Sequence, residues 1–197
     1  VFREVIEAGI VVGIVMAETS TGAYQPIEEI SKLVHEAGAL LLVDAVTSLG
    51  GVPVEVDGWN IDAIYSGTQK CLSCPPGLSP TSFSPRAMDV IMNRKTKVQS
   101  WYLDVSMLAN YWGQNRVYHH TGPINMTWGL YEALCLIHEE GLENCFARHL
   151  RNHRALKAGL AAIGIKYSAQ EGHQLPMLNA VYVPEGVDDA AVRSALL

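Results

Sequence analysis

Residues 9–44 read GIVVGIVMAETSTGAYQPIEEISKLVHEAGALLLVD and predict a strand, a helix and a second strand. The run Gly9–Ala17 is almost continuously β-branched, which is typical of a strand buried on both faces of a parallel sheet. Pro26 opens a helix that Gly38 ends, and apolar residues recur along it with a period of 3.6. The run Ala39–Val43 is a second buried strand and leads into Asp44. This strand–helix–strand unit predicts a parallel α/β sheet.

The following residues extend the same sheet. Ile61–Ser66 (IDAIYS) is a third strand, and its connection to the second is long enough for a parallel crossover. Thr81–Phe83 is a further short strand, and Pro85 opens a helix. The segment 95–115 is rich in aromatic residues and is expected to be irregular.

A long helical region is predicted from Pro123 to Ile163, with a break at Gly141. We place a domain boundary there. Residues 1–141 are expected to form part of a large α/β domain, a mostly parallel sheet sandwiched by helices. Residues 142–197 are expected to begin a smaller α+β domain. Its predicted strands are Ile165–Ser168 and Leu178–Val183.

The composition narrows the class of protein. The chain has 197 residues, with 20 acidic and 14 basic side chains, and 49% of its residues are hydrophobic. Such a chain is too apolar to be disordered, and its net charge of -6 does not favour nucleic acid. No apolar run approaches the roughly 20 residues that a membrane helix needs. Charged residues make up only 17%, which suggests that a partner subunit covers part of the surface.

The cysteines and histidines do not indicate a metal site. Cys71 and Cys74 form a single C-x-x-C that a Pro-Pro-Gly turn follows, so we expect reduced thiols packed beside a turn. His119 and His120 could be ligands or bases. Adjacent residues on an extended chain point in opposite directions, so neither histidine receives a role.

Both ends suggest a part of a longer polypeptide. Val1 is not an initiator Met, and the helix that Asp188 caps has barely two turns before Leu197. Targeting signals at either end would then lie outside this sequence. The cysteine content fits the cytosol, or an organelle such as a peroxisome or mitochondrion, and not a secreted protein.

Polar residues follow the predicted strands: Thr19-Ser20-Thr21, Asp44 and Gln69-Lys70. Open α/β sheets bind ligands at this edge. A salt bridge that only stabilises the sheet is one interpretation of Asp44 and Lys70. The other is a pyridoxal 5'-phosphate (PLP) site, which needs a lysine to form a Schiff base and an acid to keep the ring nitrogen protonated.

Seven short motifs resemble one enzyme family. They are ETSTG (Glu18–Gly22), LLVDAVTSLGG (Leu41–Gly51), YSGTQK (Tyr65–Lys70), PPG (Pro75–Gly77), RKTK (Arg94–Lys97), YHHT (Tyr118–Thr121) and GLEN (Gly141–Asn144). In order and spacing they resemble the class V aminotransferases of PLP fold type I, and within these the alanine–glyoxylate (serine–pyruvate) aminotransferases. The resemblance implies transfer of an amino group from alanine or serine to glyoxylate or pyruvate.

The resemblance assigns roles to the residues at the strand ends. It implies that Lys70 forms the Schiff base and then carries the α-proton of the substrate. Asp44 would pair with the pyridine nitrogen, and Val46 would lie against the face of the ring.

Four further residues would contact the cofactor. Thr19 would bond near the phenolic oxygen and Gln69 near the phosphate, although a turn cap and a surface amide are the simpler interpretations. Tyr118 and Thr121 are implied to bind the phosphate held by a partner subunit, so a homodimer with shared active sites is expected.

The resemblance leaves alternatives open. A kynurenine-type or serine–glyoxylate transaminase stays open, because the residues that select the substrate would lie largely outside this sequence. A non-catalytic truncated domain is a further alternative, although the retention of Lys70 and Asp44 argues against it. Cysteine desulfurases typically carry a histidine before the lysine, where this chain has Gln69. The family's phosphate loop and its substrate-binding arginine would lie outside this sequence, so the isolated chain is expected to be inactive. A nucleotide-binding domain is disfavoured because no phosphate-binding glycine motif is present.

Overall fold

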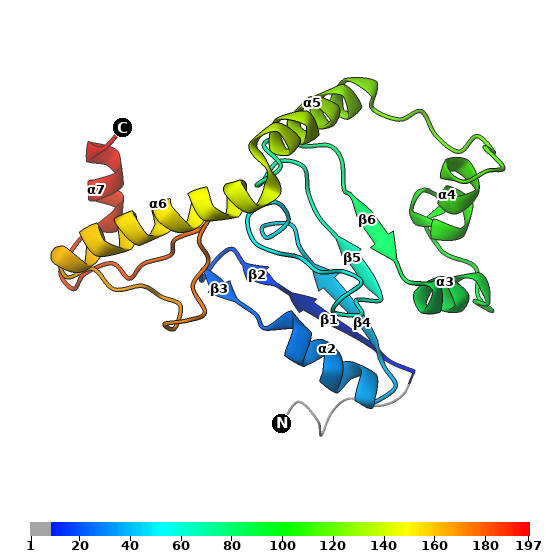
Figure 1. The fold of residues 1–197 in the computed structure, drawn as a ribbon, viewed down its shortest axis with the longest axis horizontal. Coiled ribbons are helices and arrows are strands. Elements are labelled where there is room, and N and C mark those ends of the chain that lie inside the picture. Colours follow the sequence, from blue (N-terminus) through cyan, green and yellow to red (C-terminus); the bar gives the residue numbers. More distant parts are fainter. Residues whose placement is uncertain (1–8) are drawn as a thin grey trace.

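The computed structural model describes residues 9–197 and contains a four-stranded sheet (Figure 1). Its strands are β1 (Val11–Val15), β4 (Leu40–Asp44), β5 (Ala63–Tyr65) and β6 (Thr81–Phe83), in the order β1-β4-β5-β6. β1, β4 and β5 are parallel, and β6 is antiparallel to β5. This confirms the predicted, mostly parallel sheet. Val1 and the seven residues after it lie outside the described residues.

Helix α2 (Ile27–Glu36) connects β1 to β4 as predicted. Ile27 and Val34 on this helix are buried with Leu41 and Val43 of β4 in the main hydrophobic core. The helix ends before Gly38, whose φ of 74° is the left-handed conformation that glycine adopts without strain. The apolar period therefore predicted both the helix and the face that it buries.

Strand β1 is buried on one face only, whereas the sequence predicted burial on both faces. Val12 and Ile14 pack against the core, whereas Val11 is 60% exposed and Val15 is 37% exposed. Alternate side chains of a strand point to opposite faces, and among residues 9–197 no element covers the second face at β1. The prediction of burial on both faces is therefore wrong for the described part of the chain.

The segment between the sheet and the long helices is more regular than predicted. After α3 (Pro85–Met92), a 3-10 turn (Trp101–Leu103) leads into α4 (Val105–Trp112). Asp104 caps α4, because its Oδ1 accepts the backbone N–H of Ser106 at 3.0 Å. The prediction that residues 95–115 are irregular is thus wrong for the 3-10 turn and for α4.

The long helical region has its predicted break. Helices α5 (Ile124–Glu140) and α6 (Leu142–Ala162) meet at Gly141, whose φ is 85°. The two strands predicted after α6 are reduced to a single antiparallel bridge between Tyr167 and Val181. The short α7 (Asp189–Ala195) follows Asp188, which caps it as predicted. None of the described helices has the length and apolarity to span a membrane.

The segment after α6 returns to the N-terminal hairpin formed by β2 (Ala17–Glu18) and β3 (Ala23–Tyr24). The Tyr24 N–H donates to the His173 carbonyl at 2.8 Å, and the Leu175 N–H donates to the Gly22 carbonyl at 3.1 Å. Leu175 is fully buried. The division into domains at residues 1–141 and 142–197 stays a prediction.

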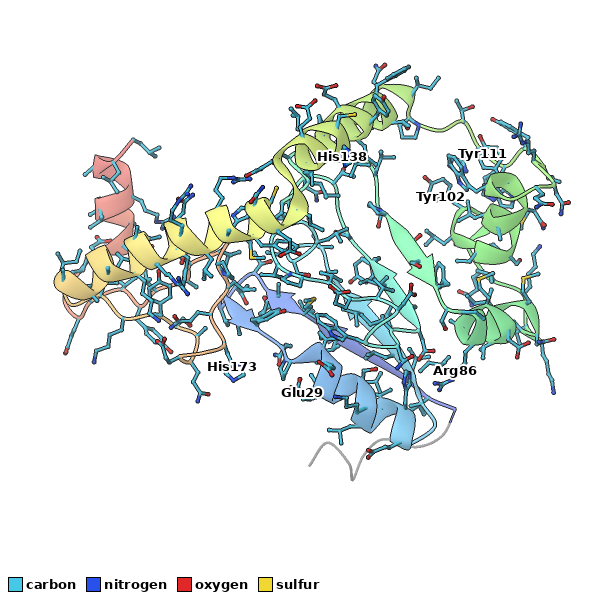
Figure 2. All side chains as sticks on the ribbon, viewed as in Figure 1. Glu29, Arg86, Tyr102, Tyr111, His138 and His173 are labelled. Atoms are coloured by element: carbon cyan, nitrogen blue, oxygen red, sulfur yellow. The ribbon has the colours of Figure 1, made fainter. Side chains whose placement is uncertain are left out.

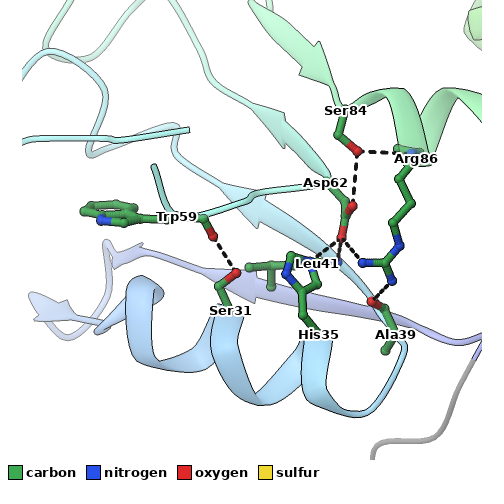
Figure 3. Close-up of polar contacts among 9 residues, drawn as sticks. Ser31, His35, Ala39, Leu41, Trp59, Asp62, Ser84 and Arg86 are labelled. Atoms are coloured by element: carbon green, nitrogen blue, oxygen red, sulfur yellow. Dashed lines mark hydrogen bonds and ion pairs between the residues drawn. The ribbon is translucent and has the colours of Figure 1, made fainter. Parts of the chain in front are cut away.

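A buried carboxylate ties α2, β4 and α3 together (Figure 3). Asp62 is 3% exposed, and its Oδ2 accepts the Leu41 N–H at 2.9 Å and lies 2.8 Å from His35 Nε2. Its Oδ1 accepts the Ser84 hydroxyl at 3.1 Å, and Arg86 lies 3.7 Å from Oδ2. Burial alone would raise the pKa of Asp62, but these donors outweigh it and lower the pKa.

We expect Asp62→Ala to lower the free energy of unfolding by about 3 kcal/mol, because it leaves the buried Leu41 N–H and the Ser84 hydroxyl without their acceptor and removes the ion pair with the partly exposed Arg86. The depressed pKa means that Asp62 stabilises the fold above pH about 4 and that this stability is lost as the pH falls through the folded-state pKa. Urea unfolding at several pH values tests both points. The exposed Asp57→Ala is the control, and an equal loss in both variants would contradict the prediction.

Candidate active site

Asp44 is the last residue of β4 and is fixed by two donors. Its Oδ1 accepts the Val46 N–H at 2.8 Å, and its Oδ2 accepts the Tyr65 hydroxyl at 2.7 Å. The bond to Asp44 raises the pKa of Tyr65, which keeps this hydroxyl a donor. Tyr65 was not among the predicted site residues, yet it is the partner of Asp44 in the parallel register of β4 and β5. The carboxylate is therefore held in one orientation at the edge of the sheet.

Lys70 lies in the loop that follows β5, the strand beside Asp44. The loop is anchored by the buried Thr68, whose hydroxyl donates to the Pro75 carbonyl at 3.0 Å. The Ser73 N–H donates to the Lys70 carbonyl at 2.9 Å, which closes the turn at the lysine. The Lys70 side chain is exposed and makes neither a hydrogen bond nor an ion pair with residues 9–197. Its amine is thus available for a reaction.

A cavity of about 280 Å³ opens beside Lys70. Its lining consists of Thr47, Lys70, Cys71, Ser73, Arg148, His149, Met177 and Leu178. The Cys71 thiol donates to the Thr47 carbonyl at 3.5 Å, and the Thr47 hydroxyl lies 2.9 Å from the Thr19 hydroxyl. The structure therefore joins Thr19, through Thr47, to the pocket that contains Lys70.

Helix α6 supplies one wall of this pocket with Arg148 and His149. Arg148 forms two bonds with Glu140, at 2.6 Å from Nε and 2.8 Å from Nη2. The Arg148 guanidinium lowers the pKa of Glu140 to about 2, and burial lowers the pKa of His149. Sequence reasoning missed Thr47, Arg148 and His149 at this site. Thr47 follows the DAV of a motif that was recognised, whereas nothing in the sequence places α6 beside Lys70.

Val46 and Gln69 lie close in sequence to Asp44 and Lys70, respectively. Val46 is half-buried and its backbone holds Asp44. Gln69 is exposed and folds back over Gly67, where a Cβ atom would lie only 2.8 Å from Gln69 Oε1. A glycine is therefore needed before Thr68 for Gln69 to take this position.

Tyr118 and Thr121 lie elsewhere in the chain. Their hydroxyl oxygens are 2.8 Å apart, and Tyr118 is 70% exposed. They line a separate cavity of about 330 Å³ that shares no residue with the one at Lys70. The connection between α4 and α5, which carries both residues, lies beyond β6 from the rest of the sheet (Figure 1). Within one chain the structure does not bring them to Lys70.

The C-x-x-C thiols have separate partners. Cys71 donates to the Thr47 carbonyl, and the buried Cys74 donates to the Met126 carbonyl at 3.9 Å. In the part of the chain that the structure describes, no three His, Cys, Asp or Glu side chains are grouped to hold a metal ion.

The sequence model of the class-V aminotransferases matches residues 3–196. The chain belongs to this family. The chain is similar to the (S)-ureidoglycine–glyoxylate transaminase of Bacillus subtilis. The two are 38% identical over an alignment that covers 95% of this chain and 49% of the relative. The alanine–glyoxylate aminotransferase of Callithrix jacchus is 44% identical over 91% of the chain and 44% of the relative.

A solved structure agrees with the sequence match. The alanine–glyoxylate aminotransferase from Nostoc sp. superposes with a TM-score of 0.91 at 50% identity, over 95% of this chain and 50% of that one. The class-V aminotransferase chain therefore spans about half the length of the relatives that it matches.

Proposed function

We propose that the whole protein carrying this chain is a PLP-dependent aminotransferase that moves an amino group from alanine or serine to glyoxylate or pyruvate. The observation that supports this most is that Asp44 ends β4 and Lys70 lies in the loop after β5, the parallel strand beside β4, in a chain of the class-V family. Ligands of open α/β sheets bind at this edge.

The residues present fit PLP. Lys70 offers an exposed primary amine without a hydrogen-bond or ion-pair partner in the described chain, which is what bonding to the cofactor's aldehyde requires. Asp44 has its two oxygens oriented by Val46 and Tyr65 and can accept a further donor such as a protonated ring nitrogen. Bound PLP would supply an electron-withdrawing ring that stabilises negative charge at the substrate's α-carbon.

The protein side chains then have distinct tasks. Lys70 would hold the cofactor through its amine, and the same amine would carry the proton to and from the substrate's α-carbon. Asp44 would keep a proton on the ring nitrogen, and the Tyr65 hydroxyl holds Asp44 in place. Thr19, which bonds to Thr47 beside the Lys70 pocket, would position the phenolic oxygen, with Val46 against the ring and Gln69 near the phosphate.

Glyoxylate is the favoured acceptor. The names of the two relatives reported above both include glyoxylate, whereas their amino donors, ureidoglycine and alanine, differ. The presence of Gln69 rather than histidine before Lys70 disfavours cysteine desulfuration. A donor such as (S)-ureidoglycine is the second candidate.

We also propose that two copies assemble with shared sites. Tyr118 and Thr121 line a cavity that shares no residue with the Lys70 pocket of their own chain, and Tyr118 is exposed. The same region exposes Trp112 and Trp128, large apolar side chains of the kind that subunit contacts bury.

The test is an assay of the whole protein with PLP. Glyoxylate or pyruvate is offered with alanine, serine or (S)-ureidoglycine, and the formation of glycine or alanine is followed. We expect glycine from glyoxylate with at least one of these donors. Failure to bind PLP, or release of sulfide from cysteine with no amino transfer, would contradict the proposal.

A further inference from the structure

His119 is the one buried residue of the segment 117–122. It is 5% exposed, His120 after it is half-buried, and Tyr118 and Thr121 are open to solvent. Its ring stacks on that of Trp101 with the centroids 3.9 Å apart and an interplanar angle of 11°. This contact joins the segment 117–122 to the 3-10 turn before α4.

Hydrogen bonds define which nitrogen of His119 carries the proton. Nε2 lies 3.1 Å from the Trp101 carbonyl, which only accepts, so Nε2–H is the donor. Nδ1 lies 2.9 Å from His120 Nδ1, and in the neutral pair it accepts the His120 N–H. The two rings are joined by this bond and their centroids lie 5.2 Å apart, so the expectation that the adjacent histidines point in opposite directions is wrong. The backbone here is not a regular strand, which removes the alternation on which that expectation relied.

A series of aromatic contacts connects the His119–His120 pair to Tyr118. The His120 ring contacts Tyr102 and Tyr111, at centroid distances of 5.1 Å and 5.5 Å. Tyr111 in turn packs edge-on against Tyr118 at 6.0 Å. Figure 2 labels Tyr111, which belongs to α4, and Tyr102, which belongs to the 3-10 turn before it. The Tyr118 hydroxyl is thereby held 2.8 Å from that of Thr121.

We propose that His119 is a positioning residue that presents the Tyr118–Thr121 hydroxyl pair, in advance of binding, to the phosphate of PLP in a second copy. The inference rests on the proposed function. A hydroxyl pair that is already ordered loses less conformational freedom on binding a phosphate, so it binds more tightly than a mobile one. His119 itself is buried and does not touch the cofactor.

The test measures PLP affinity of the whole protein by titrating the apoprotein. We expect His119→Phe, which preserves a ring against Trp101 but removes both nitrogens, to raise the Kd for PLP about tenfold. At saturating PLP, kcat should stay within about twofold, because Lys70 and Asp44 are unchanged. His119→Gln retains a donor for the Trp101 carbonyl and should recover part of the affinity.

A double-mutant cycle with Tyr118→Phe separates positioning from general stability. If His119 acts through Tyr118, removal of the Tyr118 hydroxyl weakens PLP binding much less in the His119→Phe background than in the wild type. Independent effects that multiply would overturn the inference. The exposed His138→Phe on α5 is the matched control and should leave the Kd unchanged.

The outcomes distinguish this inference from the proposed function. If the wild type binds no PLP, the proposed function fails. If the wild type binds PLP through Lys70 but His119→Phe and His119→Gln both leave its Kd unchanged, only the positioning role fails. Should His119→Phe not fold, as judged by circular dichroism, the His119→Gln cycle with Tyr118→Phe decides in the same way.

Discussion

We expect Lys70→Ala to reduce kcat of the whole protein for amino transfer to glyoxylate by at least about 10³-fold. The reason is that one amine has two tasks in the proposed chemistry: it holds the cofactor, and it moves the α-proton of the substrate. The exposed position of Lys70 on an anchored loop means that its removal should cost little stability. Initial rates at saturating PLP, with circular dichroism as a check on folding, give the result.

Two comparisons make this prediction specific. Lys166→Ala removes an exposed lysine remote in sequence from the site and should leave kcat unchanged. A small primary amine such as methylamine, added to Lys70→Ala, should restore a measurable part of the rate, because it can replace the missing proton carrier. Unchanged activity in Lys70→Ala would show that the reactive amine is another one.

Asp44→Asn is expected to lower kcat/KM by about 10²- to 10³-fold, the range found when a single electrostatic contact to the reacting system is removed. The amide has nearly the shape of the carboxylate, and its oxygen can still accept the Val46 N–H. What it loses is the negative charge that keeps a proton on the ring nitrogen. The fold should therefore persist while the chemical step slows.

The prediction for Asp44→Asn is tested by measuring the rate of proton removal from the substrate's α-carbon. Exchange of the α-hydrogen of alanine with solvent deuterium, followed by NMR, should slow in Asp44→Asn in proportion to kcat. Asp57→Asn removes an exposed carboxylate elsewhere and should have no effect. If Asp44→Asn only weakened PLP binding and exchanged the α-hydrogen at the normal rate, Asp44 would be a structural partner and not an electronic one.

The local signals in the sequence predicted the elements that lie around the candidate site. The β-branched runs and the apolar period of the helix between them correctly predicted that β1 and β4 are parallel. They also predicted that Asp44 lies at the carboxyl end of β4. Gly141 predicted the break between α5 and α6 because its positive φ is a local property of the backbone.

Contacts between distant parts of the chain were harder to predict. Arg148 and His149 reach the pocket at Lys70 only because α6 crosses it, which no spacing encodes. The prediction of two strands after α6 was wrong. These segments share only one bridge, and their β-branched residues Val181 and Val183 are exposed instead of packed in a sheet. Helix α4 was missed although Asp104 supplies a side-chain cap, since the aromatic residues around it obscured the helical period.

Covalent labelling of the whole protein tests the central claim most directly. Borohydride reduces a carbon–nitrogen double bond between a lysine amine and the aldehyde carbon of PLP, and so fixes the cofactor to its lysine. Peptide mass spectrometry should then find the pyridoxyl group on Lys70, and no label should remain at this position in Lys70→Ala. A label on a different lysine, or none on a protein that transfers amino groups, would contradict the account.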